Sequence, residues 1–517
     1  MFLGLDSSTQ SLTAVIMDPS AGTIVCQLSV NFGSELPQYL SPSGFIPGGA
    51  GGEVHANPAM WLEALDLLLS RLATATDLSK VKVIAGSGQQ HGSVYLDSTF
   101  DTRLAALDAS RNLAEQLTPA FTRGTSPIWM DTSTGAECAE ITEALGGSDE
   151  VCRLSGSVAI ERFSGPQIRR FFKADPVAYE RTTRIHLVSS FMASVLAGKS
   201  VPIDFGDGAG MNLLNLATQS WDPELLAATA PDLGQKLLPA ALAMTIQGNV
   251  ADYFVRKYGF SESATLALFT GDNPASLVGM GATAPGNVVI SLGTSDTFFA
   301  AMPGPKTDPN GFGHVFGNPA GGFMSLICFR NGSLAREALR NQLGLDWSAF
   351  DREALAKTRA AAGTNSMLPF YGPEITPRHD FSVPVLQGEA AFESGENPGL
   401  QVRALLEGQF LNMRLHSQWM GVKTERIRLT GGAAKNDGIA QMVADIFQSP
   451  VERLDVLNSA ALGASLIAAA AAGHDLTALQ ETFCSAEAGS SLQPDHALAE
   501  VYQDALIRFQ ALLALNS

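Results

Sequence analysis

Three things are scarce in this sequence: basic residues, cysteine and long apolar runs. The 517 residues include 33 Lys and Arg against 51 Asp and Glu, which gives a formal net charge of −18. Such a chain lacks the basic surface by which proteins bind nucleic acid or an anionic membrane. We therefore expect neither partner. An anionic ligand must be held by local groups, such as backbone N–H groups, helix N-termini or a metal ion.

The shortage of cysteine and of apolar runs argues against two further classes of protein. The five cysteines are odd in number and form no Cys-x-x-Cys pair, so we expect reduced, packed thiols rather than a disulfide framework. The longest apolar run, 460–472, is short for a membrane span and rich in small residues, which favours a tightly packed buried helix. Asp6 interrupts the first apolar run, and no basic segment precedes it. We expect a cytoplasmic protein without an export signal.

The chain does contain one pattern twice: a strand, a turn rich in hydroxyl groups and glycine, and a second strand. In the first copy, residues 2–5 and 12–17 read as strands around Gly-Leu-Asp-Ser-Ser-Thr-Gln. In the second, residues 288–292 and 298–302 flank Gly-Thr-Ser-Asp-Thr. A further strand is expected after each copy, at 23–30 and 323–329.

This repetition predicts duplicated domains. A chain of 517 residues is also too long for one compact core. We place the boundary near Ala284-Pro285-Gly286, which gives domains 1–285 and 286–517. Helical and strand patterns alternate elsewhere, which indicates α/β layers. We expect further strands at 81–85, 265–269 and 427–429, helices starting near Pro58, Pro274 and Asn436, and a long surface loop at 368–398.

The two polar turns are suited to phosphate. Glycine and small hydroxyl residues at a turn tip expose backbone N–H groups and add hydrogen-bond donors. Asp6 supplies a carboxylate where a hard cation such as Mg²⁺ would lie beside a phosphate. Two such turns facing each other across a cleft would hold a polyphosphate. The candidate phosphate-binding residues are Ser8, Thr9 and Gln10 in the first turn and Gly293, Thr294 and Ser295 in the second.

Several stretches resemble a known family. "GLDSSTQ", "SLGTSDT" and "LTGGAAKND" are similar to the first phosphate, second phosphate and adenosine motifs of the sugar kinase, actin and heat-shock ATPase superfamily. "GSGQQHGSVY", "PIWMDTST", "ERFSGPQI", "DGAGMNLL" and "FTGDNPASLVGMG" resemble the FGGY carbohydrate kinases, most closely the xylulokinases, and the resemblance runs from residue 2 to about 472. It implies two duplicated actin-like, ribonuclease H-like α/β domains around a deep cleft, with ATP and Mg²⁺ as cofactors.

Asp272 is the candidate general base. It follows the expected strand 265–269 and precedes a helix, and loops at the carboxyl ends of strands are where α/β sheets bind ligands. A sugar hydroxyl attacks phosphorus efficiently only if a positioned group accepts its proton, and a carboxylate can do so. The alternative is that Asp272 only caps the helix. Most of the catalytic assignment rests on the resemblance.

The resemblance also implies the remaining site residues. The sugar contacts would be Gln90, His91, Arg162, Asp272 and Asn273. The adenosine site would include Trp347, Gly431, Gly432, Lys435 and Asn436. A structural histidine at 91, a surface ion pair at Arg162 and ordinary packing of Trp347 remain the alternatives.

The chain departs from the family pattern at two points. Many members carry Trp-x-Asp-x-Arg where this chain has Trp129-Met130-Asp131-Thr132-Ser133, so the contact made by that arginine is in doubt and Arg162 is our candidate replacement. The tetrapeptide Phe-Gly-Gly-Tyr that names the family is also absent.

The sequence thus favours an ATP-dependent kinase that converts a ketopentose, D-xylulose above others, to its 5-phosphate. A kinase for ribulose, an alditol or glycerol is the nearest alternative. A non-catalytic nucleotide-binding relative is the alternative from another class, although it would not need a base on the sugar side. The oligomeric state, monomer or homodimer, is left open.

Overall fold

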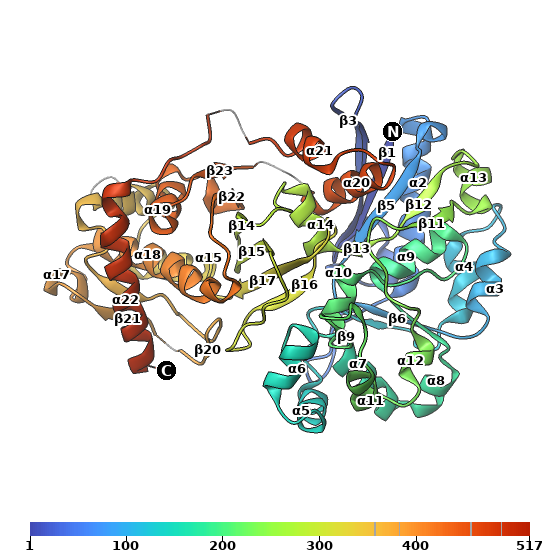
Figure 1. The fold of residues 1–517 in the computed structure, drawn as a ribbon, viewed down its shortest axis with the longest axis horizontal. Coiled ribbons are helices and arrows are strands. Elements are labelled where there is room, and N and C mark those ends of the chain that lie inside the picture. The colour runs from blue at the N-terminus through green and yellow to red at the C-terminus, as the bar shows by residue number, and fades with distance from the viewer. Residues whose placement is uncertain (356–357, 382, 455–457, 487–488, 517) are drawn as a thin grey trace. The chain divides into compact units, whose positions relative to one another are not determined.

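The computed structural model describes residues 1–355, 358–381, 383–454, 458–486 and 489–516 (Figure 1). Its backbone contacts form two compact units. These units do not correspond to a single division at residue 285, because two segments that follow this residue in the sequence belong to the first unit. The first unit comprises Met1–Thr283, Val315–Met324 and Leu457–Cys484, and the second Ala284–His314, Ser325–Val456 and Ser485–Ser517. Within the described residues, no helix is long and apolar enough to cross a membrane.

The first unit is built on a mixed sheet. Its strands are β1 Phe2–Ser7, β2 Ser11–Asp18, β3 Thr23–Asn31, β5 Val83–Gly88, β11 Ile246–Asn249, β12 Thr265–Ala267 and β13 Thr270–Gly271. The strand order is β11-β12-β5-β1-β2-β3, with β13 also paired to β5. All of these strands except β11 and β13 lie where the sequence predicts strands. β1 and β2 are buried along nearly their whole length, which is why they read as apolar runs.

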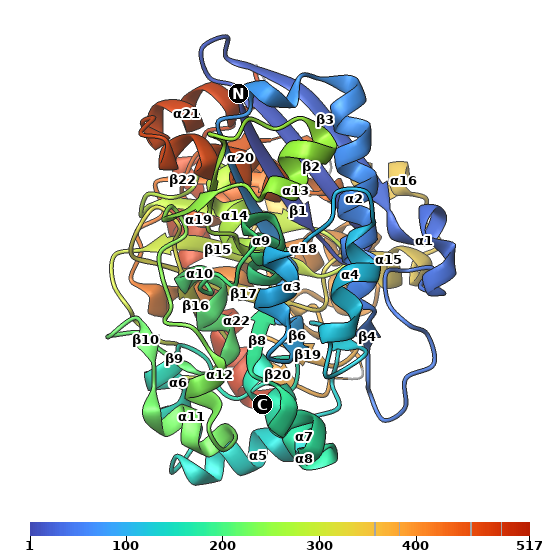
Figure 2. The ribbon, with the colours of Figure 1, turned by 90° about the vertical axis from the view of Figure 1, so that its right-hand side faces the viewer.

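Helices cover both faces of this sheet (Figure 1). They are α2 Pro58–Ala75 and α9 Val188–Ala197 on one face, and α20 Ser459–Ala471 with α14 Asp272–Gly279 packed on it on the other. α2 begins where predicted: the Asn57 side chain accepts a hydrogen bond from the N–H of Ala59, and Pro58 is the first helical residue. Figure 2 shows α2 lying along β2 and β3.

The apolar run 460–472 forms the buried helix α20, as predicted. Its small residues allow backbones to approach closely. A Cβ on Gly463 would lie 1.8 Å from the carbonyl oxygen of Ala275 in α14. A Cβ on Gly4 of β1 would lie 2.2 Å from the carbonyl oxygen of Ala461. Larger side chains at these positions would push α20 off the sheet and off the helix that carries Asp272.

A second sheet repeats the arrangement of the first. Its strands are β14 Asn287–Leu292, β15 Asp296–Met302, β16 His314–Gly317, β17 Phe323–Phe329, β22 Arg426–Thr430 and β23 Val451–Arg453, in the order β16-β17-β15-β14-β22-β23. β14 pairs antiparallel with β15 and parallel with β22, just as β1 pairs with β2 and β5. The repeated strand–turn–strand pattern is therefore confirmed. β16 and β23 were not predicted from the sequence.

The helices of the second unit pack around this sheet. They include α15 Ser333–Gln342, α16 Trp347–Leu355, α18 Pro398–Ser417, α19 Asp437–Phe447 and α22 Ala499–Asn516. α18 is buried from Gly399 to Met413. α19 begins after Asn436, as predicted, because the Asn436 side chain accepts hydrogen bonds from the N–H groups of Gly438 and Ile439.

The predicted surface loop at 368–398 is wrong. The described part of this segment contains short elements: the end of β18 Ser366–Leu368, β19 Glu374–Ile375, β20 Arg378–His379, β21 Val385–Gln387 and α17 Ala390–Glu393. Phe370, Phe381 and Phe392 are buried and anchor it. Elements of two to four residues are too short to show a hydrophobic period, so the Pro and Gly content dominated the interpretation.

Candidate functional site

In the first unit, three neighbouring parallel strands end at the same level. β5 lies between β1 and β13, and Ser87 is in register with both Asp6 and Thr270. Asp6, the segment after β5 and the residue after β13 therefore emerge at one edge of the sheet. This brings Asp6, Gln90, His91 and Asp272, which lie far apart in the sequence, to one place.

Asp6 is buried, and the structure gives it one side-chain partner. Ser87 Oγ donates to Asp6 Oδ1 at 2.8 Å, and no other hydrogen bond reaches this carboxylate from the described residues. Burial and, to a smaller extent, the charge of Asp272 raise the pKa of Asp6 to about 7, while the Ser87 hydrogen bond opposes the rise. Ser87 belongs to the stretch GSGQQHGSVY, but nothing local in the sequence indicates that its hydroxyl reaches Asp6.

Asp272 is the first residue of α14 and is half-buried. The N-cap of this helix is Gly271, so the capping role offered as an alternative does not belong to Asp272. Asp272 Oδ1 accepts hydrogen bonds from the backbone N of Asn273 at 2.8 Å and from Asn273 Nδ2 at 3.0 Å. Burial raises the pKa of Asp272 to about 6, and these hydrogen bonds oppose the rise.

Gln90 orients Asn273. Gln90 is 2 % exposed, and its Oε1 accepts from Asn273 Nδ2 at 2.8 Å. Asn273 Nδ2 therefore bridges Gln90 and the candidate base. Gln90 Nε2 is buried without a partner among the described residues. A buried amide hydrogen without an acceptor is suited to a ligand that supplies one.

His91 has a fixed orientation. Its backbone adopts φ +72°, a rare conformation for a residue other than glycine. Its ring stacks on Phe163 with centroids 4.3 Å apart, and Nδ1 lies 2.8 Å from the carbonyl oxygen of Gly210. Burial, and then the charge of Arg162, lower the pKa of His91 to about 3. Because a carbonyl can only accept, Nδ1 carries the proton of this neutral ring and Nε2 is left as an acceptor.

Arg162 lies in the same cluster. Its guanidinium carbon is 5.6 Å from the centre of the Phe163 ring, on which His91 stacks. Two further buried carboxylates, which were not singled out from the sequence, interact with each other, and one of them also interacts with Asp272. They are Asp204, which caps the short helix Phe205–Gly208, and Asp207, whose raised pKa owes first to burial, then to Asp204 and in part to Asp272.

The three predicted phosphate ligands in the turn between β1 and β2 differ in how far their hydrogen-bonding groups are already occupied within the protein. Both Ser8 N and Ser8 Oγ donate to the carbonyl oxygen of Ser11 at 3.0 Å, which closes the turn. Thr9 and Gln10 lie at the tip, and Gln10 is exposed. Of the three residues, Ser8 has the least capacity left for a ligand.

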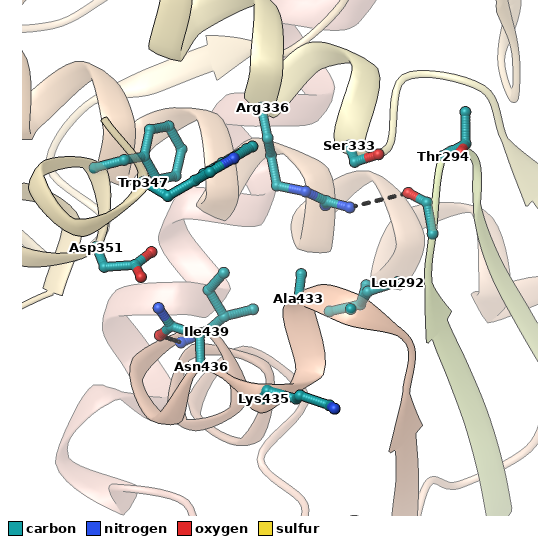
Figure 3. Close-up of a pocket in the computed structure, with 13 residues that line it drawn as sticks. Leu292, Thr294, Ser333, Arg336, Trp347, Asp351, Ala433, Lys435, Asn436 and Ile439 are labelled. Atoms are coloured by element: carbon teal, nitrogen blue, oxygen red, sulfur yellow. Dashed lines mark hydrogen bonds between the residues drawn. The ribbon is translucent and has the colours of Figure 1, made fainter. Parts of the chain in front are cut away.

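The second unit contains a cavity of about 510 Å³ beside the turn between β14 and β15 (Figure 3). It includes six of the predicted nucleotide residues: Gly293, Thr294, Trp347, Gly432, Lys435 and Asn436. Ser295 and Gly431 do not line it. The remaining lining residues are Leu292, Ser333, Arg336, Phe350, Asp351, Ala433 and Ile439.

Trp347 borders this cavity with a partly exposed ring. The indole is 43 % exposed, so it is not a core residue. The guanidinium carbon of Arg340 lies 4.4 Å from its ring centre, and Phe350 packs against it edge to face at 5.5 Å. An indole fixed from two sides, with an open face, is suited to stack against a flat ring such as adenine.

Gly431 is required by the backbone. Its φ is +95°, and a Cβ there would lie 2.3 Å from the carbonyl oxygen of Leu292 at the end of β14. Only glycine lets the short helix Gly432–Lys435 pass this close to the strand. A Cβ on Gly432 would meet nothing within 4 Å, so this residue keeps a bare backbone beside the cavity without a steric reason inside the protein.

A buried ion pair supports the second turn, and the sequence analysis missed it. Arg336 Nη1 and Nη2 each donate to an Asp296 carboxylate oxygen at 2.9 Å, and Nη2 also donates to the carbonyl oxygen of Gly293 at 3.3 Å. Asp296 directly follows Gly293-Thr294-Ser295, so an acidic residue in the second turn was the available signal. The pair fixes the turn by a bidentate contact.

The described residues contain no group of three or more His, Cys, Asp or Glu side chains that could hold a metal ion. A fully protein-bound metal is not required here, because Mg²⁺ is often bound by one or two carboxylates together with substrate phosphates and water. Asp6, with one hydrogen-bond partner in the described part of the chain and a raised pKa, fits such a single-carboxylate site.

Comparisons with known proteins give a consistent result. Residues 1–279 match the N-terminal domain model, and residues 288–472 the C-terminal domain model, of the FGGY family of carbohydrate kinases. The chain is 41% identical over 489 residues to "Xylulose kinase 2" of Arabidopsis thaliana, covering 91% of this chain and 87% of that protein. It is 38% identical over 526 residues to "Xylulose kinase" of Mus musculus, covering 99% and 93%. In fold it is similar to the crystal structure of xylulose kinase from Rhodospirillum rubrum, with a TM-score of 0.83 at 21% identity, covering 99% and 98%.

Proposed function

Because this chain belongs to the FGGY family of carbohydrate kinases, we propose that it transfers the γ-phosphate of ATP to D-xylulose and forms D-xylulose 5-phosphate. The choice of sugar is supported by relatives named as xylulose kinases that align with nearly the whole chain. The observation that carries the chemistry is the common edge at which Asp6, His91 and Asp272 emerge from parallel strands.

The sugar binds to fixed side chains in this proposal. His91 Nε2 accepts a hydrogen bond from one sugar hydroxyl, since its Nδ1 proton is committed to Gly210. Arg162 and Asn273 donate to others. Arg162 takes over the contact that a Trp-x-Asp-x-Arg arginine makes in other family members. Gln90 Oε1 holds Asn273 in place, and Gln90 Nε2, which has no partner among the described residues, donates to the sugar.

Asp272 accepts the proton of the C5 hydroxyl as that oxygen attacks phosphorus. With a pKa of about 6, Asp272 is ionised at neutral pH and yet basic enough to take a proton during attack. Its hydrogen bonds from Asn273 hold the carboxylate in place while the reaction proceeds. Catalysis by phosphoryl-transfer enzymes is mainly positioning and electrostatic stabilisation, and this arrangement supplies both.

Adenosine binds in the cavity of the second unit, beside Trp347, Gly432 and Asn436. Thr294 and the neighbouring backbone bind phosphate, as do Thr9 and Gln10 in the first turn. Asp6 would hold Mg²⁺, which would neutralise charge on the phosphates. Domains 1–285 and 286–517, in this proposal, serve sugar and adenosine respectively. We also propose that the protein works in the cytoplasm.

The test is detection of phosphosugar by mass spectrometry after incubation with MgATP and a panel of D-xylulose, D-ribulose, an alditol and glycerol. We expect D-xylulose to give the highest kcat/KM. A higher value for another substrate would reassign the sugar and leave the kinase intact. ATP hydrolysis without any phosphosugar would refute the kinase and favour a nucleotide-binding relative.

A further inference from the structure

Trp129, to which neither the motifs nor the proposed mechanism assign a role, contacts the first phosphate turn. Its indole is 45 % exposed, an unusual position for so large an apolar ring. The polar end is nevertheless committed: Nε1 donates to Thr9 Oγ1 at 2.8 Å. The two residues are 120 positions apart in the sequence, so the fold places the indole against the tip of the turn.

This hydrogen bond determines what the Thr9 hydroxyl can do. An indole N–H can only donate, so Thr9 Oγ1 must accept, and the hydroxyl proton has to point elsewhere. The acceptor that the protein offers is Gln89 Oε1 at 3.5 Å, which is long for an O–H···O hydrogen bond. The indole therefore occupies one of the two lone pairs of Thr9 Oγ1, and the hydroxyl proton has only this long contact to Gln89. A charged phosphate oxygen forms a shorter bond, roughly twice as strong as a neutral one.

Both partners are held by their own surroundings. The turn is closed by Ser8 and Ser11, and Gly44 lies against it so closely that a Cβ there would be 1.7 Å from the carbonyl oxygen of Thr9. The Trp129 loop is fixed two residues later. There the buried Asp131 accepts from the backbone N of Val54 at 2.9 Å, from the backbone N of Ser133 at 2.9 Å and from Gln167 Nε2 at 2.7 Å. The contacts around the turn and around the Trp129 loop thus hold Trp129 and Thr9 in place relative to each other.

We propose that Trp129 is a positioning residue: its N–H sets the rotation of the Thr9 hydroxyl so that the hydroxyl proton is directed at an oxygen of the transferred phosphate. The inference rests on the proposed kinase function and adds to it a residue that acts through Thr9. Because catalysis of phosphoryl transfer depends mainly on positioning, and the Thr9 hydroxyl contacts phosphate and not sugar in this proposal, the effect falls on turnover more than on sugar binding.

The experiment is a double-mutant cycle in the full chain with MgATP and the preferred sugar. Trp129→Phe removes the N–H and keeps an aromatic ring, Thr9→Val removes the hydroxyl, and Thr9→Ser keeps it. Trp221→Phe is the matched control, since Trp221 Nε1 donates to the carbonyl oxygen of Leu238 at 2.6 Å and not to a candidate site residue. Thermal unfolding of each variant verifies that it is folded.

We expect Trp129→Phe to lower kcat about 3- to 10-fold and Thr9→Val about 10- to 100-fold. The double variant should be no slower than Thr9→Val, because the indole acts only through the hydroxyl. Thr9→Ser should recover most of the loss, and Trp221→Phe should match wild type. KM for the sugar should stay within about twofold in Trp129→Phe.

Three results would overturn the inference while leaving the kinase intact. The first is a kcat for Trp129→Phe equal to that of Trp221→Phe. The second is a double variant whose loss is the product of the two single losses, which means independent action. The third is a rise in sugar KM at unchanged kcat, which would make the ring a sugar contact. Absence of phosphosugar with the wild-type chain would instead refute the proposed function, and this inference with it.

Discussion

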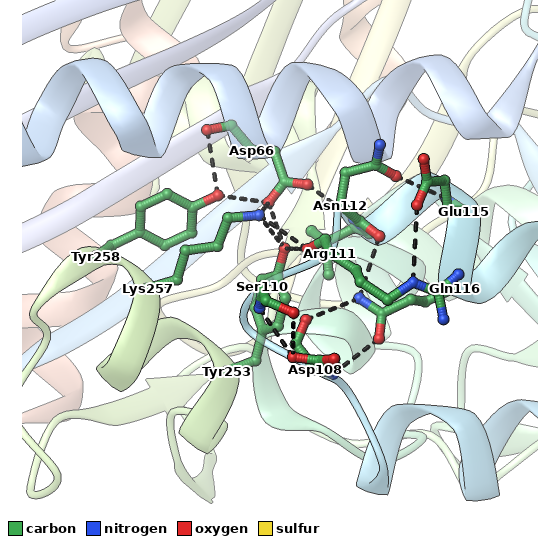
Figure 4. A network of polar contacts seen from close by, with 11 residues as sticks. Asp66, Asp108, Ser110, Arg111, Asn112, Glu115, Gln116, Tyr253, Lys257 and Tyr258 are labelled. Carbon is green, nitrogen blue, oxygen red and sulfur yellow. Dashed lines mark hydrogen bonds and ion pairs between the residues drawn. The ribbon is translucent and has the colours of Figure 1, made fainter.

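Asp6 and Asp66 lie in the same unit and are buried to the same extent, each with 8% of its surface exposed, but they have different surroundings. Asp66 lies on α2, in the network of Figure 4. Its carboxylate accepts from Leu113 N at 2.8 Å, Tyr253 OH at 2.8 Å, Tyr258 OH at 2.5 Å and Lys257 Nζ at 3.3 Å. These partners come from the helices Leu113–Leu117 and Asp252–Tyr258. Asp66 therefore joins three helices.

Asp6 has only the Ser87 hydroxyl among the described residues, and the charge of Asp272 works against its ionisation. Burying a carboxylate is unfavourable unless hydrogen bonds or opposite charges compensate. At Asp66 the protein supplies the compensation itself. At Asp6 it does not, and in our proposal Mg²⁺ does. A comparison of partners, and not of burial, therefore separates a structural carboxylate from a functional one in this fold.

The largest expected effect is on turnover. Asp272→Asn keeps the shape of the side chain and removes its basicity, so kcat should fall by roughly 10²–10⁴. Folding should be little affected, since the amide oxygen can still accept from Asn273. Steady-state kinetics with the preferred sugar, ATP binding by calorimetry and urea unfolding give the three readouts. Turnover close to wild type would show that another group accepts the proton.

The next largest effect is on the free energy of unfolding, and kcat should not change. Asp66→Ala removes the common acceptor of four donors and leaves Lys257 without its partner, which should cost about 2–4 kcal/mol in the free energy of unfolding. The kcat of the folded fraction should match wild type, because Asp66 is not among the site residues. Urea unfolding measures the first quantity, and active-site titration with kinetics the second. An unfolding midpoint equal to that of wild type would contradict the assignment of Asp66 as structural.

Whether a residue of these carboxylate sites could be predicted from the sequence depends on how far apart in the sequence the interacting residues lie. Asp6 was found because it sits in a turn beside a strand, where local pattern carries the signal, and Asp272 was found mostly through the resemblance of its motif to the FGGY kinases. Ser87 and Arg336 were missed because their roles come from pairing between distant segments: Ser87 donates to a residue 81 positions away, and Arg336 to one 40 positions away. The network of Asp66 was invisible for the same reason. The prediction for segment 368–398 failed for a different reason. The phenylalanines that anchor this segment are isolated in Pro- and Gly-rich sequence, so no hydrophobic pattern is visible.

The pH dependence of stability should distinguish Asp6→Asn from wild type. The pKa of Asp6 is raised from its usual 3.8 to about 7, so the folded chain binds this proton more tightly than the unfolded chain. The resulting stabilisation is complete below about pH 4 and is lost as the pH rises through 7. Without ligand, wild type should therefore lose on the order of 1–3 kcal/mol more than Asp6→Asn between pH 5 and pH 8.

Urea unfolding of both chains at four pH values in that range measures this difference, and the contribution of Asp272 remains in both. Parallel curves would mean that Asp6 is ionised in the folded chain well below pH 7. The contrast with Asp66 would then be lost, because the charge of Asp6 would be stabilised in the folded chain by interactions beyond its hydrogen bond from Ser87.

The smallest expected effect is the change in stability when one hydrogen-bond donor is removed from each of the two carboxylates. Tyr253→Phe leaves Asp66 with its other donors and should cost about 1 kcal/mol in the free energy of unfolding. Ser87→Ala removes the sole side-chain donor that Asp6 has among the described residues. It should nevertheless cost less than Tyr253→Phe below pH 7, because Asp6 can stay protonated there and needs no donor to balance a charge. The loss should appear instead as a higher pKa of Asp6 and a higher Mg²⁺ concentration at half-maximal rate, measured by Mg²⁺ titration at pH 6.5 and 8. If Ser87→Ala destabilises the chain more than Tyr253→Phe and leaves the Mg²⁺ dependence unchanged, then Asp6 is the structural carboxylate, and its resemblance to a metal ligand comes only from its position in the turn.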